Sequence, residues 1–204
     1  MKGKKLYTEE ADSGFCNTEQ PEFIKSKSYS TTQDSLTNSE LDNFIEKIDW
    51  EKQSSKKIKH RPQTSVFDVA AYIVQKMGTL STMKLQKLVY YAQAWSLVWD
   101  EQPLFNEPIE AWANGPVVRD LFYFHRGRFS VSSIPIGNPD LLNENQKETI
   151  DAVLDFYGDK PAQWLIDLSH QEQPWQKTRK NLAPSVPSNR IIPLDLIAEY
   201  YSSL

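Results

Sequence analysis

The sequence predicts a mainly α-helical fold: one compact domain of about six helices, with room for a minor β-hairpin, preceded by a largely disordered N-terminal arm. After Ser65, apolar residues recur at helical spacing in several stretches, and capping residues, prolines and glycines bound these stretches. Residues 1–64 are instead rich in Ser, Thr and Gln, and they have too few apolar positions to offset the entropy of folding. We therefore expect a flexible polar arm over 1–64 and a domain over 65–204.

The arm contains one amphipathic stretch, at about 39–52, which begins with a capping signal at Ser39. Its apolar residues recur at helical spacing: Leu41, Phe44, Ile45 and Ile48. An isolated helix of this length is marginal in water, so we expect it to form only against a surface of its own domain or of a partner. Phe44 and Ile48 are candidate partner contacts, and on that interpretation their replacement by Glu weakens the complex. The basic stretch 52–62 is interpreted as a solvated tether rather than a phosphate-contacting strip.

Two helices are predicted at the start of the domain. The first runs from a Ser65 cap to Gly78, and its apolar stripe consists of Val66, Val69, Ala70, Ile73, Val74 and Met77. The second, from about Ser81 to Trp99, is apolar on nearly every side in its second half, which predicts a central position. Lys84 and Lys87 lie in its first turns, where positive charge opposes the macrodipole. They are candidates for partner binding or for ion pairing within the fold.

The middle of the domain is predicted to be less regular. Ile109–Trp112 is short enough to be an extended segment or a turn. Gly115 followed by Pro116 predicts a helix start, because Pro at the first helical position sacrifices no needed hydrogen bond, and this helix continues to Gly127. Residues 129–136 fit a small strand pair or an irregular excursion.

Three further helices complete the predicted architecture. One runs from an Asn143 cap to Gly158, one begins at Pro161 and runs out over 169–175, and one begins at about Pro193. Together they give about six helices packed around one core.

Composition narrows the classes of protein. Lys and Arg total 23 against 27 acids, so no basic surplus indicates nucleic acid or an anionic membrane as the partner. The single cysteine, Cys16, cannot form an internal disulfide, in agreement with a reducing compartment. No apolar run approaches the roughly 20 residues that span a bilayer, and the first ten residues lack the apolar core of a signal peptide. We expect a soluble cytoplasmic protein without membrane contact.

No catalytic motif is found in the sequence. It has no Gly-rich phosphate loop, no Gly-x-Ser-x-Gly, no His-Glu-x-x-His and no cysteine pair, and its three histidines lack metal-ligand spacing. His170 and Glu172 form the one acid–base pair that the pattern allows, although hydrogen bonding across a turn is the favoured interpretation. We therefore expect neither enzymatic activity nor a cofactor or metal.

Aromatic residues are abundant, with six Trp, nine Tyr and nine Phe. The stretch 121–126 places an aromatic or a cation on every side of a helix, so not all of these side chains can face inward. Exposed aromatics mixed with Arg are typical of interface hot spots, which makes Tyr123, Phe124 and Arg126 candidate anchors for a protein partner. A nucleic-acid stacking platform uses the same residue types but needs more Lys and Arg nearby.

Five segments, in order, resemble a known family. They are Asp68-Val-Ala-Ala-Tyr-Ile73, Met83-Lys-Leu-Gln-Lys-Leu-Val-Tyr-Tyr-Ala-Gln-Ala-Trp95, Pro103-Leu-Phe105, Ile109-Glu-Ala-Trp-Ala-Asn-Gly-Pro-Val-Val118 and Leu168-Ser-His-Gln-Glu-Gln-Pro-Trp175. The chain resembles the Panacea domain, also called the SocA-like antitoxin or phage-associated protein family, over most of residues 65–204. The resemblance implies a helical domain that neutralises unrelated toxins by direct protein contact.

The resemblance makes an antitoxin, with a cognate toxin as its partner, the expected function. The alternatives are a prophage-associated adaptor or regulator without a toxin, and, less favoured, an enzyme built on His170 and Glu172. Direct DNA binding is not favoured, because the arm shows no helix-turn-helix pattern. Lys84, Lys87 and Trp175 are motif positions taken as candidate toxin contacts. The motif positions expected to be structural are Leu85, Gln86, Tyr90, Tyr91, Trp95, Trp112, Gly115, Pro116 and His170.

Overall fold

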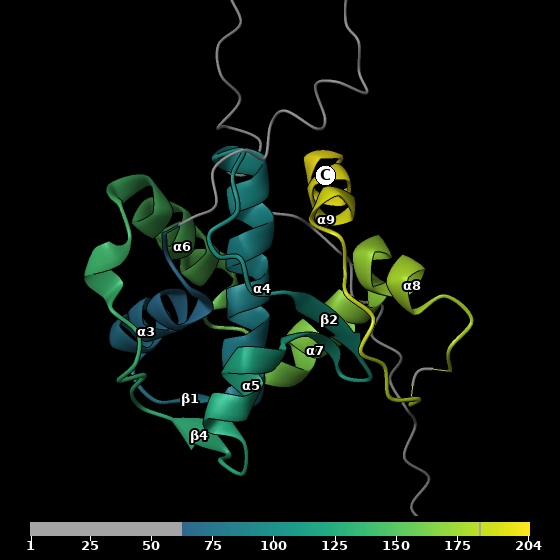
Figure 1. Cartoon of the computed structure of the whole chain (residues 1–204), viewed down its shortest axis with the longest axis horizontal. Coiled ribbons are helices and arrows are strands. Elements are labelled where there is room, and N and C mark those ends of the chain that lie inside the picture. The colour runs from purple at the N-terminus through teal and green to yellow at the C-terminus, as the bar shows by residue number, and fades with distance from the viewer. Residues whose placement is uncertain (1–62, 184) are drawn as a thin grey trace, which may run out of the picture.

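The computed structural model describes residues 63–204 with the exception of residue 184. Within this part of the chain there are seven α-helices and two small antiparallel sheets (Figure 1). The helices are α3 (Val66–Met77), α4 (Thr82–Trp99), α5 (Arg119–His125), α6 (Glu144–Tyr157), α7 (Ala162–Gln171), α8 (Gln173–Arg179) and α9 (Leu194–Ser202). The strands are β1 (Leu80–Ser81), β2 (Ile109–Trp112), β3 (Gly115–Val118) and β4 (Ser130–Val131), and a 3-10 turn, η2, spans Pro139–Leu141.

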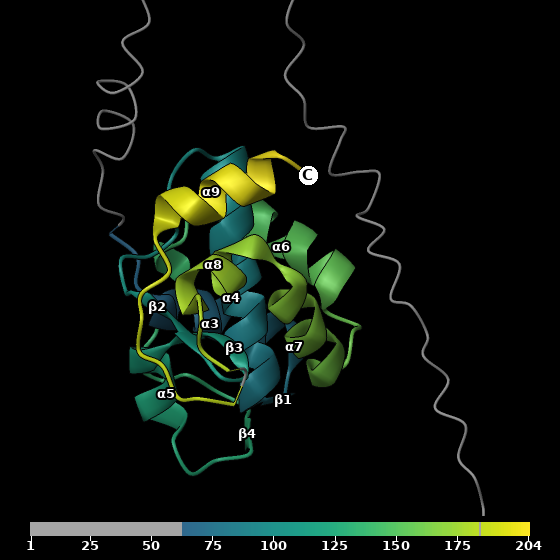
Figure 2. The same ribbon diagram turned by 90° about the vertical axis from the view of Figure 1, so that its right-hand side faces the viewer.

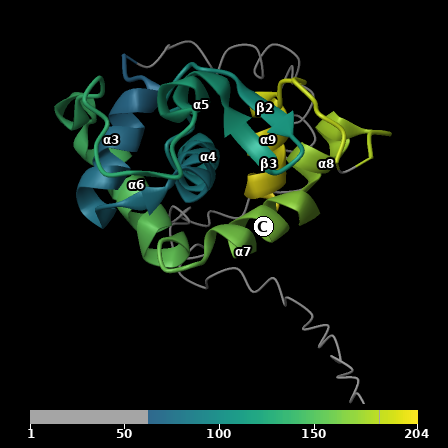
Figure 3. The ribbon, with the colours of Figure 1, turned by 90° about the horizontal axis from the view of Figure 1, so that it is seen from below.

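Helix α4 forms the centre of the domain. The Ser81 side chain caps it by accepting a hydrogen bond from the Lys84 amide, and from Leu85 to Leu97 every side chain is buried. Viewed along its axis, α4 is surrounded by α3 and α6 on one side, by the β2–β3 hairpin and α9 on the other, and by α7 (Figure 3). Helix α9 lies across one end of α4, next to α8 (Figure 2). The all-round burial confirms the central position predicted for this helix.

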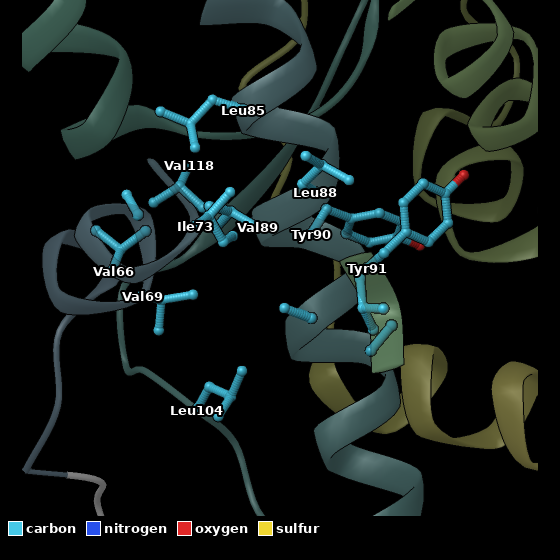
Figure 4. Packing of buried hydrophobic residues seen from close by; sticks show 14 of the residues in the cluster. Val66, Val69, Ile73, Leu85, Leu88, Val89, Tyr90, Tyr91, Leu104 and Val118 are labelled. Carbon is cyan, nitrogen blue, oxygen red and sulfur yellow. The ribbon is translucent and has the colours of Figure 1, made fainter. Parts of the chain in front are cut away.

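Helix α3 packs against α4, the η2 turn and α6, and its apolar stripe faces α4 (Figure 4). Val66, Val69 and Ile73 have no exposed surface, and neither have Leu85 and Leu88 on the facing helix. The predicted capping box at the start of α3 is present: the Ser65 amide donates to Asp68 at 2.7 Å. Gly78 ends α3 with a φ of 73°, a value that favours glycine. The predicted bounds of this helix are therefore confirmed.

Polar side chains on α4 hold the neighbouring loops through backbone hydrogen bonds. Gln93 Oε1 accepts from the amides of Leu104 and Phe105 at 2.8 and 3.2 Å, and Gln93 Nε2 donates to the Phe105 carbonyl at 3.1 Å. Ser96 Oγ donates to the Gln102 carbonyl at 2.7 Å. An unpaired buried polar group is destabilising, so these bonds determine where the segment after α4 lies.

The prediction of a helix that begins at Gly115 is wrong for its first turn. Gly115–Val118 instead forms strand β3, which pairs with β2 in the register Ile109↔Val118 and Trp112↔Gly115, so that Ile109–Trp112 is extended. The Gln86 side chain, buried in α4, accepts from the Val118 amide at 2.9 Å and donates to its carbonyl at 3.2 Å. These bonds hold Val118 in an extended conformation, and α5 begins only at Arg119. Pro116 is tolerated because β3 pairs only with β2 among the described strands and is therefore an edge strand.

The other predictions have mixed outcomes. The helices predicted after Asn143, Pro161 and Pro193 are confirmed as α6, α7 and α9. Of the strand pair considered for 129–136, only β4 forms, and its partner is β1. Helix α8 was not predicted, because residues 169–175 were interpreted as the end of the preceding helix. Proline is also favoured in the first turn of a helix, and Pro174 lies there in α8.

Two further predictions concern the N-terminal arm and the absence of membrane-spanning helices. The arm and the helix expected at about 39–52 lie outside the described residues. None of the helices that the structure describes is long and apolar enough to cross a bilayer.

The hydrogen bonds of Gln93 lead to a first prediction. Gln93→Leu leaves three buried backbone groups unpaired, so we expect the free energy of unfolding in urea to fall by roughly 3 kcal/mol. The control is Gln75→Leu, an exposed position on α3, where we expect a change within about 0.5 kcal/mol. Equal effects for the two variants would show that Gln93 does not organise the loop.

Candidate functional site

Three segments that are distant in sequence meet beneath the β2–β3 hairpin. Lys87, on α4, is fully buried, and its Nζ donates to the Pro116 carbonyl at 3.0 Å. Gly115 has a φ of +95°, and a Cβ at this position would lie 2.5 Å from Lys87 Nζ and 2.6 Å from Ser169 Oγ of α7. Both the backbone conformation and the space therefore require glycine. Three of the family-like motifs, 83–95, 109–118 and 168–175, therefore contact one another at this point.

Lys87 shares the interior with a buried acid. Glu172, between α7 and α8, is only 2% exposed and accepts a hydrogen bond from the Tyr201 hydroxyl at 2.8 Å. Burial raises the pKa of Glu172 to about 8, although the Tyr201 hydrogen bond and the charge of Lys87 oppose the shift. Burial also lowers the pKa of Lys87 to about 7, against the attraction of Glu172. Burial therefore favours the neutral form of Glu172 at neutral pH.

Four tyrosines surround this carboxyl group. The rings of Tyr91 and Tyr157 are stacked with centroids 4.3 Å apart, and Tyr201 meets Tyr90 edge-on at 6.2 Å. The hydroxyls of Tyr90 and Tyr91 are close enough to lower the pKa of Glu172. In this conformation, however, neither hydroxyl has a hydrogen-bond partner of normal geometry, and neither has Glu172 Oε1. Burial raises the pKa of all four tyrosines, so they remain neutral.

His170 and Trp175 connect α7 and α8 to the hairpin. Their rings are stacked with centroids 4.2 Å apart, and Trp175 Nε1 donates to the Trp112 carbonyl at 2.8 Å. Burial, together with the positive charge of Lys87, lowers the pKa of His170. His170 thus has an aromatic neighbour and Glu172 an interior hydroxyl, an arrangement suited to packing rather than to proton transfer. Across residues 63–183 and 185–204, no group of three His, Cys, Asp or Glu side chains is placed to hold a metal ion.

The surface around α5 has the opposite character, because its aromatic groups are exposed. Tyr123 is 58% exposed and Phe129 is 88% exposed, and Arg126 and Arg128 are exposed beside them. We call these four residues, with the pocket next to them, the α5 face. Large apolar side chains close to Arg are the composition of protein-binding hot spots.

The pocket of the α5 face has a volume of about 240 Å³. It lies between the start of α4, the tip of the hairpin and α5, and its lining includes the apolar side chains Met83, Trp112 and Phe122. Its charged lining residues are Arg126 and Arg128, and none of the residues that line it is an acid. The pocket is smaller than the roughly 300–1,000 Å³ typical of small-molecule sites. Its size suits a single anchoring side chain.

A second hollow, of about 490 Å³, lies on the other side of Trp112. Its lining includes Glu110 and Arg119, which form an ion pair at 2.9 Å, and residues 187–189. Glu110 also accepts a hydrogen bond from Trp112 Nε1 at 2.7 Å. The charges of this hollow are thus already paired with each other. Within the described part of the chain no acid is paired with Arg126 or Arg128, and Arg128 lies over the Phe124 ring at 5.6 Å.

The candidate contacts differ in how far they are exposed. Tyr123 and Arg126 are exposed on the α5 face, whereas Phe124 is partly buried and packs edge-on against Phe67. Lys87 and Trp175 are buried, so their side chains offer a partner little or no surface in this fold. Lys84 is half-buried, and its Nζ donates to the Gly158 carbonyl at 2.6 Å. Phe44 and Ile48 lie outside the described residues.

The family-like motif positions assigned to structure mostly lie inside the domain. Trp112 and His170 are half-buried, and the remaining seven are buried: Leu85, Gln86, Tyr90, Tyr91, Trp95, Gly115 and Pro116. Two residues of the α5 face were missed. Arg128 and Phe129 directly follow Gly127, the residue that ends the predicted helix. A large apolar residue in the loop after a helix, next to an arginine, was the signal that could have identified them.

Part of the chain matches a protein-family model. Residues 85–176, somewhat less than half of the chain, match the family model described as "Antitoxin SocA-like, Panacea domain". The match confirms the resemblance indicated by the motifs, and it covers α5, the hairpin, α7 and most of α4. No curated protein and no solved structure matches the chain.

Gly115 leads to a prediction with a matched control. Gly115→Ala introduces both an unfavourable φ and an overlap with Lys87 and Ser169, whereas Gly127→Ala has a φ of +81° and nothing within 4 Å of the new Cβ. We expect Gly115→Ala to lower the free energy of unfolding in urea by roughly 2 kcal/mol more than Gly127→Ala. If both variants lower the free energy of unfolding by similar amounts, the side chains of Lys87 and Ser169 move aside at little energetic cost.

Glu172 leads to a prediction about pH. Between pH 4.5 and about 8 the carboxyl group is ionised in the unfolded chain and protonated in the folded one. Folding then takes up a proton, so the contribution of Glu172 to stability decreases as the pH rises. Lys87 contributes in the opposite direction above about pH 7, so the window from pH 5 to 7 isolates Glu172.

We expect the difference in the free energy of unfolding in urea, Glu172→Gln minus the original protein, to increase by roughly 2 kcal/mol as the pH rises from about 5 to about 7. Gln keeps an acceptor for Tyr201 and cannot ionise, and the titration of His170 is common to both proteins. Glu199→Gln, an exposed position on α9, is the control and should follow the original protein. If the free energy of unfolding changes with pH in the same way for Glu172→Gln and the original protein, the carboxyl group is ionised in the folded state.

Proposed function

We propose, from the premise that residues 85–176 match the SocA-like antitoxin Panacea domain, that this protein is an antitoxin that silences a toxin by binding it directly. The observation that carries the proposal, beside the match, is the α5 face. It exposes Tyr123 and Phe129 next to two arginines. Such a surface recognises protein, and it lies within the matched span.

The proposed mechanism is stoichiometric occlusion. Aromatic side chains provide large apolar area at a low loss of rotamer entropy, and arginines beside them pair with acids on a partner. The pocket accepts one anchoring side chain of the toxin, and the two arginines favour a toxin surface with acids at its edge. No chemical step is required of the antitoxin, and the buried Lys87–Glu172 pair serves the fold that presents this face.

Growth rescue tests the proposal. The small gene next to that of this chain is expressed alone and then together with this chain. We expect growth arrest in the first case and relief in the second, with a stable complex on purification. Failure of both rescue and complex formation contradicts the proposal. Harmless neighbours would favour the alternative of an adaptor or regulator without a toxin.

Point variants test the face itself. We expect Tyr123→Ala and Phe129→Ala each to weaken binding to the purified product of that toxin gene by about 2 kcal/mol, or roughly 30-fold in Kd, by calorimetry. The matched control is Leu204→Ala, which removes an exposed apolar side chain at the C-terminal end, far from α5 and β4 (Figure 1). If all three variants bind equally well, the toxin binds another surface.

A further inference from the structure

The chain contains a segment that complements the α5 face. Residues 39–51, Ser-Glu-Leu-Asp-Asn-Phe-Ile-Glu-Lys-Ile-Asp-Trp-Glu, lie outside the described part and carry five acids and one lysine. Drawn on a helix at 100° per residue, the stripe of Leu41, Phe44, Ile45 and Ile48 is bordered by Asp42 and Asp49 on one side and by Glu40 and Glu51 on the other. We call residues 39–51 the acidic segment.

The two partners match in charge and in apolar character. The acidic segment has an apolar stripe between two rows of carboxylates, and the α5 face has an apolar pocket whose charged lining residues are Arg126 and Arg128. Carboxylates that pair with arginine make bidentate hydrogen bonds, which are stronger than neutral ones. Phe44, at the centre of the stripe, is a side chain of the size that a pocket of about 240 Å³ accepts.

The tether is long enough for this contact. Residues 52–62 join the acidic segment to the described domain, and eleven residues span up to about 36 Å when extended. The domain begins beside the target, because the ring of Phe67 lies 6.1 Å from that of Phe124 on α5. The pocket is on the other side of α5, about one helix diameter of roughly 10 Å away. The tether itself is basic, so it has no attraction for the two arginines.

We propose that the acidic segment of this chain binds as a helix to the α5 face of the same molecule, with Phe44 in the pocket and the bordering acids against Arg126 and Arg128. A tether of this length gives an effective concentration in the millimolar range, which favours the same molecule over a second copy. The contact also supplies the surface that an isolated helix of this length needs in order to form.

The binding of this segment has a regulatory consequence. A segment that covers the α5 face reduces the apparent affinity of any other ligand for that face in proportion to the fraction of molecules in which the face is free. The proposal does not rest on the antitoxin function, and its tests use no toxin. If a toxin does bind the same face, Phe44→Glu/Ile48→Glu strengthens toxin binding, the reverse of the effect expected for an arm that contacts the toxin.

Amide NMR spectra of the full chain provide the first test. We expect Phe44→Glu/Ile48→Glu to shift the amide signals of Tyr123, Arg126 and Phe129. The matched control is Asn43→Glu/Trp50→Glu, which adds the same two charges on the opposite side of the helix and leaves these signals in place. Unchanged signals in the first variant would overturn the proposal. Shifts that depend on protein concentration would also overturn it, because they would show binding between two copies.

A synthetic peptide of residues 39–52 provides the second test. By calorimetry we expect it to bind the Phe44→Glu/Ile48→Glu chain at least roughly tenfold more tightly than the original chain, whose own segment occupies the face. Adding Arg126→Glu/Arg128→Glu to that variant should abolish this binding. Equal affinity for the first two chains, or binding that survives the arginine changes, would contradict the proposal.

Discussion

The fold depends on the burial of a polar helix. From Leu85 to Leu97 helix α4 is enclosed on all sides, yet it carries glutamines, a lysine and a serine in that stretch. Each of these side chains needs a partner in the interior, and the partners are mostly backbone groups of the irregular segments. The need to satisfy α4 thus places the hairpin and the loop after α4, and through the hairpin it places α5 and the exposed aromatic face.

The helices with a clear apolar period could be predicted from the sequence, because burial of one face is a local pattern. The hairpin could not be, because Gly115-Pro116 is also a good helix start, and only the distant Gln86 side chain holds Val118 extended. Helix α8 was missed for a similar reason. Pro174 is compatible with a helix end and with a first turn, and the hydrogen bond from Trp175 to the Trp112 carbonyl secures the second of these.

The sequence predicted residues of the candidate site only where too many large side chains follow one another for all of them to be buried. Six consecutive aromatic, basic and apolar residues cannot all face inward, so Tyr123 and Arg126 could be identified in advance. The burial of Lys87 could not be predicted, because a charged side chain near the start of a helix is normally solvated. Its place in the interior depends on a carbonyl almost thirty residues later and on a glycine that leaves room for the ammonium group.

Helix α9 has a consequence for the synthesis of the chain. Tyr201 packs against Tyr90, Tyr91 and Trp95, more than a hundred residues earlier in sequence. At translation rates of about 5–20 residues per second, the aromatic side of α4 therefore waits on the order of 10 s at the ribosome before Tyr201 is made. During that interval the nascent chain presents rings that the finished domain conceals, so a chaperone has its main opportunity to bind before residue 201 emerges.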